Sequence, residues 1–173
     1  MAGTVFITGG ARSGKSRLAE DLALKRGAPL VYIATGLAGD GEMAERIDRH
    51  RARRGTAWRT VEEPLDLTGA ISAAEGTCMA MLVDCITLWL TNLLLKYDDA
   101  STVMKEVERL ALLLPALKTP LILVSNEVGL GIVPENRLAR TFRDLAGEAN
   151  ELLAGAADEV YVMFSGLPLK LKG

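Results

Sequence analysis

A glycine-rich segment near the N-terminus constrains the fold of this chain more than any other feature. Its residues Gly9-Gly10-Ala11-Arg12-Ser13-Gly14-Lys15-Ser16 match the pattern G-x-x-x-x-G-K-[ST]. The apolar, β-branched stretch Thr4–Thr8 before it predicts a strand, and Lys15–Arg26 predicts a helix. Glycines let the backbone wrap around a phosphate, and the amide N–H groups and the helix N-terminus then point at the anion. We therefore expect a phosphate-binding loop in which Lys15 pairs with phosphate oxygens and Ser16 ligates Mg²⁺.

Apolar strands and helices alternate along the rest of the chain. Further strands are expected at Leu30–Ala34, Ala57–Val61, Ala80–Val83, Leu121–Ser125 and Val160–Phe164. Helices are expected at Glu42–Arg54, Leu65–Glu75, Ile86–Leu95, Val103–Leu114 and Glu135–Leu153. In the last helix, an apolar face is expected from Leu138, Phe142, Leu145, Ala149 and Leu152. The alternation predicts a single α/β domain over residues 1–173, with a mostly parallel sheet covered by helices on both faces.

Polar or glycine-containing segments follow several of the expected strands. They are the Gly9 loop, Thr35-Gly36, Asp84, Asn126-Glu127 and Ser165-Gly166. Ligands of open parallel sheets bind beyond the carboxyl ends of the strands. We therefore expect these segments to meet at one edge of the sheet.

Asp84 follows the apolar strand Ala80–Val83 directly. A phosphate-loop protein places at such a position the carboxylate that holds Mg²⁺ or its water. The alternative is an N-cap for the helix that begins at Ile86. Because a capping role does not exclude a metal role, we expect Asp84 on the metal side of the site.

The charge balance argues against a chain that binds nucleic acid or membranes through its overall charge, since the formal net charge is only -2. The apolar segment Cys78–Leu95 approaches spanning length, but it carries Asp84 near its middle. A carboxylate there would cost about 2.5–3.5 kcal/mol, so a buried strand and a buried or interface helix explain the segment better. Cys78 and Cys85 lack zinc or redox spacing, and we expect buried, reduced thiols in a cytoplasmic protein.

The expected helix Glu42–Arg54 carries the only histidine of the chain, His50, with Arg46, Arg53 and Arg54 on one stripe. On the pattern alone, a solvated charged helix is the favoured interpretation. The second interpretation is an imidazole nucleophile set among guanidinium groups that keep it neutral and stabilise charge on an attacked phosphate. A nucleic-acid patch is the third and is weaker, because no overall basic charge supports it.

Glu62 lies after that helix, in the segment that begins at Trp58. It is a candidate for holding a ribose hydroxyl or a base edge. A surface carboxylate is the simpler interpretation, and the sequence pattern alone favours it.

Taken together, these residues resemble the bifunctional adenosylcobinamide kinase and adenosylcobinamide-phosphate guanylyltransferase family of cobalamin biosynthesis. The matching stretches are Thr8–Arg17, Tyr32–Thr35, Glu42–His50, Trp58–Thr60, Asn126–Arg140, Phe142–Asp144 and Ala157–Val160. The resemblance spans nearly the whole chain, and the Asn126–Arg140 run is far more specific than a phosphate loop.

The resemblance implies two reactions on one P-loop NTPase-like scaffold. ATP or GTP phosphorylates the hydroxyl of the aminopropanol arm of adenosylcobinamide. GTP then donates GMP to adenosylcobinamide phosphate through a GMP–histidine intermediate, with release of pyrophosphate. Mg²⁺ is the implied cofactor, and no partner nucleic acid or membrane span is implied.

The resemblance also assigns residues. The nucleophile falls on His50 without ambiguity, because Arg49 precedes it where relatives can carry a second histidine. The implied nucleotide contacts are Gly9, Gly10, Ala11, Arg12, Ser13, Gly14, Lys15, Ser16, Ala34, Thr35, Gly36, Arg51, Ala52, Arg53, Arg54, Glu62 and Asp84. The implied assembly is a homotrimer with sites between subunits, for which the apolar Ile86–Leu95 helix is a candidate packing surface.

Two other functions stay open on the residues alone. One is a small-metabolite kinase with no covalent intermediate, in which the arginines only neutralise phosphates. The other is a nucleotide-dependent interaction module, although no switch or base-specificity motif supports it.

Overall fold

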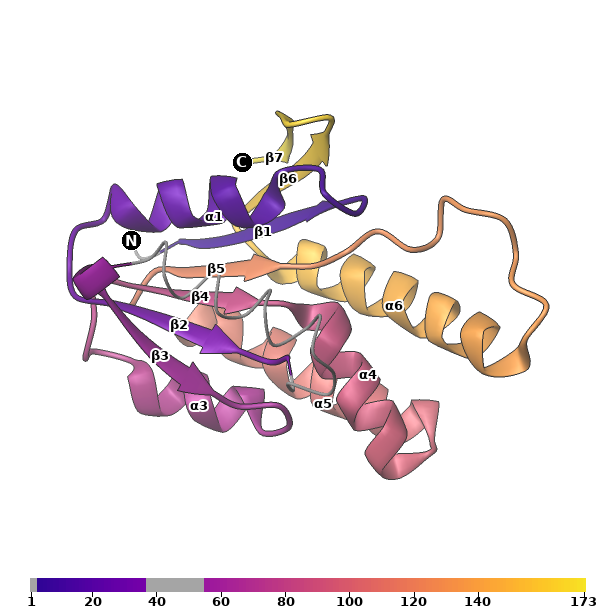
Figure 1. The fold of residues 1–173 in the computed structure, drawn as a ribbon. Coiled ribbons are helices and arrows are strands. Elements are labelled where there is room, and N and C mark those ends of the chain that lie inside the picture. Colours follow the sequence, from indigo (N-terminus) through magenta and orange to yellow (C-terminus); the bar gives the residue numbers. More distant parts are fainter. Residues whose placement is uncertain (1–2, 37–54) are drawn as a thin grey trace.

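The computed structural model describes residues 3–36 and 55–173 (Figure 1). Its strands are β1 Thr4–Gly9, β2 Leu30–Ala34, β3 Trp58–Glu62, β4 Ala80–Asp84, β5 Leu121–Val124, β6 Glu159–Phe164 and β7 Leu167–Lys172. Its helices are α1 Lys15–Leu24, α3 Leu67–Ala74, α4 Ile86–Tyr97, α5 Ala100–Leu113 and α6 Arg137–Ala156, with 3₁₀ turns at Gly55–Ala57 and Leu114–Ala116. The strands form one seven-stranded sheet in the order β3-β2-β4-β5-β1-β6-β7. All neighbouring pairs run parallel except β6 and β7.

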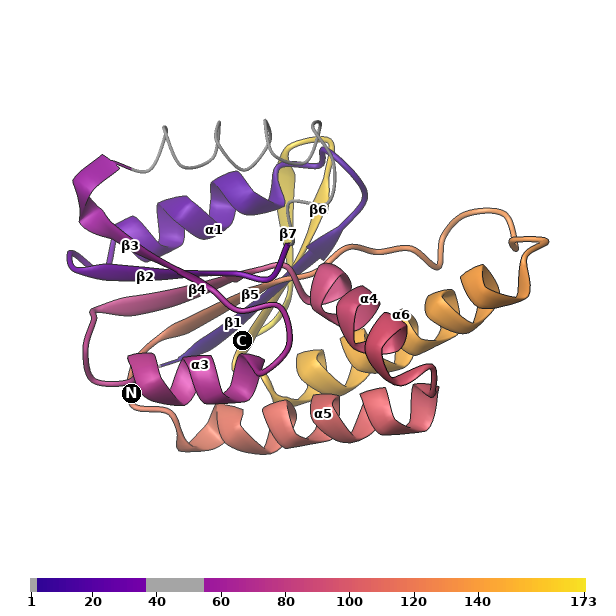
Figure 2. The same cartoon turned by 60° about the horizontal axis from the view of Figure 1, so that its bottom comes forward.

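Helices cover both faces of the sheet, as the sequence predicts. Figure 2 shows α1 on one face and α3, α4, α5 and α6 on the other. Successive residues of β1 divide between the two cores: Val5 and Ile7 pack under α1, whereas Phe6 packs under the other helices. Since both faces are covered, the central strands carry continuous apolar runs, such as Val5–Ile7 and Leu121–Val124, rather than apolar residues at alternate positions.

The α4 helix is part of the core of its own chain. Ile86, Trp89, Leu90 and Leu93 are buried against the sheet and the neighbouring helices, while Leu95 is exposed. The prediction that the Ile86–Leu95 helix serves as a packing surface between subunits is therefore wrong for most of its apolar residues. Within residues 3–36 and 55–173, no helix combines the length and apolar character that crossing a membrane requires.

The buried face of α6 differs from the predicted one. Leu145, Ala149 and Leu153 are buried, while Leu138 and Leu152 are exposed. Leu145, Ala149 and Leu153 are spaced four positions apart, a spacing that lines one side of a helix. The helix begins at Arg137, because Asn136 caps it by accepting the Ala139 N–H at 3.1 Å.

Strand β7 was not predicted. The segment alternates leucine with lysine or proline, and every residue in it is exposed. Antiparallel pairing with β6 through the turn at Ser165 and Gly166, both at positive φ, makes it a strand. Pro168 is tolerated because β7 is the edge of the sheet.

The predicted helix Glu42–Arg54 lies outside the described residues.

Trp89 is the largest fully buried side chain, and its indole Nε1 donates to the Leu65 carbonyl at 2.8 Å. We expect Trp89→Ala to lower the free energy of unfolding by about 3–5 kcal/mol, because it leaves a cavity and an unpaired carbonyl. Urea unfolding followed by circular dichroism measures the effect. Leu112→Ala, at an exposed position on α5, is the control and should change stability by less than about 0.5 kcal/mol.

Candidate nucleotide site

The carboxyl ends of the parallel strands bring the predicted segments to one edge of the sheet (Figure 1). The strand register sets this arrangement. Gly9 lies opposite Met163, Ile7 opposite Val124, and Asp84 opposite both Val124 and Ala34. The phosphate loop (residues 9–16), Ala34–Gly36, Asp84, Asn126-Glu127 and Ser165-Gly166 therefore follow the ends of neighbouring strands, as predicted.

The phosphate loop has a backbone that specific glycines make possible. Gly9 has φ +145°, and a Cβ there would lie 2.6 Å from the Met163 carbonyl oxygen. Gly14 has φ +96° and is the N-cap of α1, whose first turn forms as the Leu18 N–H donates to the Gly14 carbonyl at 3.1 Å. The loop therefore bends into the N-terminus of α1, which presents amide donors to an anion.

Lys15 folds back into this loop. Its Nζ donates to the carbonyls of Gly9 at 2.9 Å and Gly10 at 2.6 Å, and the residue is buried. The ammonium group is thus held inside the curve of the loop. There it is placed to pair with the oxygens of a phosphate that the loop encloses.

Two neighbouring segments support the loop. The Glu127 N–H donates to the Gly9 carbonyl and the Gly166 N–H donates to the Ser13 carbonyl, both at 3.0 Å. The Ser13 Oγ is buried and has no hydrogen-bond partner in the described part of the chain. Because a buried hydroxyl normally has a partner, this donor fits a loop that takes an anionic ligand.

Asp84 ends β4 with its side chain half-buried. Tyr32 Oη donates to Asp84 Oδ2 at 3.1 Å, and this bond orients the carboxylate at the edge of the sheet. The N-cap of α4 is Cys85, without a side-chain cap. The alternative that Asp84 caps this helix is therefore wrong.

Ser16 is half-buried in the first turn of α1 and directly follows Lys15. Its hydroxyl and the Asp84 carboxylate are oxygen donors at the same edge of the sheet, which are the ligands that Mg²⁺ prefers. No cluster of three or more acidic, cysteine or histidine side chains able to hold a metal occurs in residues 3–36 and 55–173.

Thr35 is engaged by the protein itself. Its Oγ1 donates to the Cys85 carbonyl at 2.7 Å and accepts the Cys85 N–H at 2.8 Å, and its carbonyl accepts Asn92 Nδ2 at 2.8 Å. The side chain is fully buried. Thr35 therefore joins the end of β2 to the start of α4, and its predicted contact with nucleotide stays a prediction, as do those of Ala34 and Gly36.

Glu62 is not brought next to the phosphate loop. It is exposed at the end of β3, and β2, β4 and β5 lie between this strand and β1. At about 4.8 Å per strand, that separation is roughly 19 Å. Its predicted contact with a nucleotide would therefore lie at the far end of the carboxyl edge of the sheet, away from the phosphate loop.

His50 and the arginine-rich segment with Arg51, Ala52, Arg53 and Arg54 lie outside the described residues, and their roles stay predictions.

The structure adds side chains to which the sequence pattern assigned no role. Tyr32 holds Asp84, and Asn126 Nδ2 donates to Thr87 Oγ1 at 2.7 Å. The buried Asn150 links α6 to this network, since Nδ2 donates to the Asn126 carbonyl at 3.2 Å and Oδ1 accepts Ser125 Oγ at 2.6 Å. The sequence signal that could have identified Ser125 and Asn126 is their position directly after a buried strand.

Cys85 is buried, and this burial, with the neighbouring Asp84 charge, raises the pKa of its thiol to about 11. The thiol is therefore protonated at neutral pH and unreactive. Cys78 is only half-buried, so the prediction that both cysteines are buried is wrong for it, although neither forms a disulfide.

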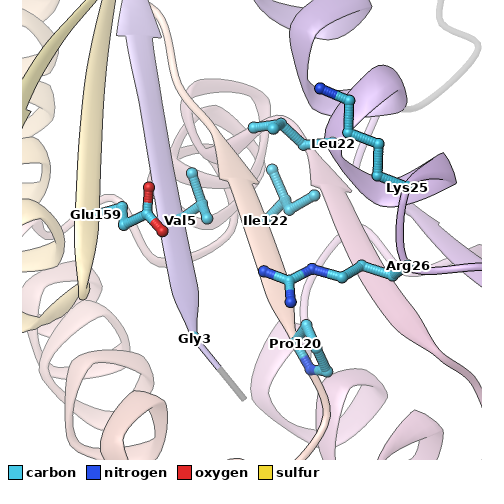
Figure 3. A pocket seen from close by; sticks show the side chains of 8 residues that line it. All are labelled: Gly3, Val5, Leu22, Lys25, Arg26, Pro120, Ile122 and Glu159. Atoms are coloured by element: carbon cyan, nitrogen blue, oxygen red, sulfur yellow. The ribbon is translucent and has the colours of Figure 1, made fainter. Parts of the chain in front are cut away.

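A hollow of about 270 Å³ lies at the opposite end of the sheet (Figure 3). It is lined by Gly3, Val5, Leu22, Lys25, Arg26, Pro120, Ile122 and Glu159. Gly3 and Pro120 precede β1 and β5, so the hollow lies at the amino ends of these strands. None of the predicted site residues within 3–36 and 55–173 lines it.

Comparison with known families decides between the functions left open by the residues. The profile of the family described as cobinamide kinase / cobinamide phosphate guanyltransferase matches residues 5–171. The chain belongs to this family. It is thus a bifunctional enzyme of the family, as its sequence resemblance implied.

Curated relatives within the family cover almost the whole chain. The bifunctional adenosylcobalamin biosynthesis protein CobP of Pseudomonas aeruginosa is 51% identical over 97% of this chain and 96% of its own length. The CobU proteins of Salmonella typhimurium and Escherichia coli are 45% and 42% identical, each over 97% of this chain and 99% of their own length.

Solved structures agree on the fold alone. The flagellar accessory protein FlaH of Methanocaldococcus jannaschii aligns with a TM-score of 0.54 at 17% identity, over 99% of this chain and 78% of that one. A KaiC-like protein of Pyrococcus horikoshii aligns with a TM-score of 0.52 at 16% identity, over 93% and 70%. The chain therefore has the P-loop NTPase-like architecture that the sequence predicted.

Gly9 and Gly10 offer a matched test of the loop. A Cβ at Gly9 would meet the Met163 carbonyl, whereas a Cβ at Gly10 meets nothing within 4 Å. We expect Gly9→Ala to destabilise the nucleotide-free protein by about 1–3 kcal/mol, and Gly10→Ala to change it by less than about 0.5 kcal/mol. Thermal and urea unfolding measure both. Equal stability of the two variants would contradict the described loop.

Proposed function

We propose that this chain phosphorylates adenosylcobinamide with ATP or GTP and then transfers GMP from GTP to adenosylcobinamide phosphate, releasing pyrophosphate. The observation that supports both steps is the family match over residues 5–171 together with a phosphate loop at the carboxyl edge of the sheet. The curated relatives carry bifunctional names and align along nearly their whole length.

The phosphate loop is proposed to anchor the triphosphate in both reactions. Lys15 lies inside the loop, and Gly14 starts the helix whose amides face the anion. Phosphoryl transfer needs little covalent help from a protein, so fixed donors that stabilise charge on the phosphates supply most of the acceleration. Gly10, Ala11, Arg12 and Ser13 complete the loop around the phosphates.

Ser16 and Asp84 would hold Mg²⁺, which neutralises phosphate charge when bound. The fit rests on their oxygen donors at one edge of the sheet and on the orientation of Asp84 by Tyr32. Tyr32 thus acts on the metal side through Asp84 rather than by contact with nucleotide.

His50 is proposed to form the covalent intermediate. An imidazole nitrogen attacks the α-phosphorus of GTP, and the bond to the bridging oxygen breaks, so pyrophosphate leaves. A phosphate oxygen of the acceptor then attacks the same phosphorus, and the P–N bond breaks. The route splits one displacement into two, and Arg51, Arg53 and Arg54 would stabilise the charge that develops.

We also propose a cytoplasmic homotrimer with sites between subunits. The support is the family resemblance, and for the compartment the two free cysteines. Most apolar residues of α4 pack within the chain, so among its apolar side chains Leu95 is one that stays exposed for such a contact.

Incubation with GTP labelled at the α-phosphate, followed by denaturation, tests the covalent step. We expect acid-labile label on the wild-type protein and none on His50→Ala, because the phosphoramidate needs the imidazole. A mass shift equal to one GMP on the intact protein is the second measurement. Label that persists in His50→Ala would sink the assignment, and labelled wild type that never passes GMP to the acceptor would contradict the transferase.

Lys15→Ala tests the shared anchor. We expect both reactions to slow by a factor on the order of 10², because one charged donor to the phosphates is lost. Rates of ADP formation and of pyrophosphate release measure the two steps separately. Lys105→Ala, at an exposed position on α5, is the control and should leave both rates unchanged.

A further inference from the structure

The loop that joins β5 to α6 (the β5–α6 loop, residues 125–136) leaves the sheet at the same edge as the phosphate loop (Figure 1). The Glu127 N–H donates to the Gly9 carbonyl at 3.0 Å, and Lys15 Nζ donates to the same oxygen at 2.9 Å. The two nitrogens therefore lie within about 6 Å of each other. The β5–α6 loop thus starts beside the group that faces the phosphates.

Glu127 carries a carboxylate at this position, and the turn that follows orients it. Its Oε1 accepts the Gly129 N–H at 3.0 Å, and the residue is half-buried. Strand β5 is the direct neighbour of β1, whereas Asp84 ends β4 and Glu62 ends β3, which lie farther away. Among the carboxylates at the strand ends of the described residues, Glu127 is nearest to the phosphate loop along the sheet.

The far end of the β5–α6 loop is also tied to the protein. Arg140 Nη1 donates to the carbonyls of Pro134 at 3.0 Å and Glu135 at 2.6 Å. Asn136 then caps α6. The loop is therefore fixed at both ends, and its middle is held away from the core.

The middle of the loop exposes large apolar side chains. Leu130, Ile132 and Val133 are 80%, 97% and 58% exposed. Exposed apolar residues that gather on one segment, rather than singly, mark a surface that binds something. A loop with exposed apolar side chains and a carboxylate-bearing residue next to the phosphate loop fits an acceptor that has both an apolar body and a hydroxyl.

We propose that the β5–α6 loop is the acceptor subsite, in which Leu130 and Ile132 contact the corrin ring and Glu127 is the general base of the kinase step. This inference rests on the proposed function, which supplies the acceptor: a large macrocycle with apolar faces and a hydroxyl-bearing arm. A second copy of this chain would contact the apolar residues but would have no use for the carboxylate of Glu127, whose backbone N–H shares the Gly9 carbonyl with Lys15. The macrocycle would contact the apolar side chains through its faces, and its hydroxyl-bearing arm would use the Glu127 carboxylate.

The kinase step transfers the γ-phosphoryl group to the hydroxyl of the acceptor. The acceptor oxygen forms a bond to the γ-phosphorus, and the bond from that phosphorus to the β–γ bridging oxygen breaks. The nucleoside diphosphate leaves with that electron pair. The hydroxyl proton passes to the Glu127 carboxylate and from there to solvent.

Glu127→Gln tests the base, because the amide oxygen can still accept the Gly129 N–H while the side chain can no longer take a proton. We expect phosphorylation of adenosylcobinamide to slow by about 10²–10⁴-fold. Transfer of GMP to separately supplied adenosylcobinamide phosphate needs no proton from a hydroxyl and should stay within about threefold of wild type. A kinase rate near that of wild type, or an equal loss in both reactions, would overturn the role of Glu127.

The double variant Leu130→Ser with Ile132→Ser tests the apolar contact. We expect its KM for adenosylcobinamide to rise at least about tenfold, with the Kd for GTP unchanged, since the variant removes apolar contact with the acceptor alone. Leu112→Ser is the matched control, because Leu112 is 80% exposed on α5, away from this edge. An unchanged KM for adenosylcobinamide would overturn the subsite. If light scattering also shows that the double variant no longer forms the oligomer of the wild type, the apolar residues contact another copy of the chain instead.

The wild-type protein separates this inference from the proposed function. If the wild type neither phosphorylates adenosylcobinamide nor transfers GMP, the proposed function fails. If the wild type does both and the variants behave like it, only the acceptor subsite fails.

Discussion

Parallel pairing of β1 with β5 on one side and β6 on the other is the constraint on which the site depends. The pairing sets Ile7 opposite Val124 and Gly9 opposite Met163, so the chain leaves these three strands at the same level. Because the three strands end side by side, the Glu127 N–H can donate to the Gly9 carbonyl and the Gly166 N–H to the Ser13 carbonyl. The phosphate loop is thus held between two segments that are distant from it in sequence, and a shift of one residue in either strand would break these bonds.

Polar residues around the loop divide into those that face a ligand and those that hold the frame. Lys15 and Asp84 present charge at the edge, whereas Thr35 uses its polar groups to join β2 to α4. Asn150 does the same between α6 and β5. Fixed charges work better than mobile ones in phosphate chemistry, because no reorganisation is needed when charge moves in the reaction. Thr35 and Asn150 therefore contribute to the proposed catalysis by holding the strands and helices of the site in place.

Much of the sheet could be predicted because its strands are buried on both faces. Leu30–Ala34 was predicted to the residue, since a short apolar run flanked by a proline and a threonine-glycine pair has few other structures available. The α6 face was predicted less well, because Leu152 and Leu153 are equally apolar and only packing decides which one turns inward. Strand β7 was not predicted, because an exposed edge strand has no burial pattern and its pairing partner alone defines it. Asp84 was given two roles by its position, and the cap geometry of α4 removed one of them.

The sequence by itself determined the phosphate loop, the α/β alternation and the family, because each of these is written in short-range spacing or in long runs of specific residues. Only the tertiary structure decided that Tyr32 orients Asp84, that Thr35 is committed to the frame, and that Glu62 lies far across the sheet from the loop. The same holds for Glu127, whose place beside Lys15 comes from the neighbouring positions of β5 and β1. The physical reason is that strand order joins residues more than a hundred positions apart, and strand order is set by the packing of the whole sheet rather than by any local pattern.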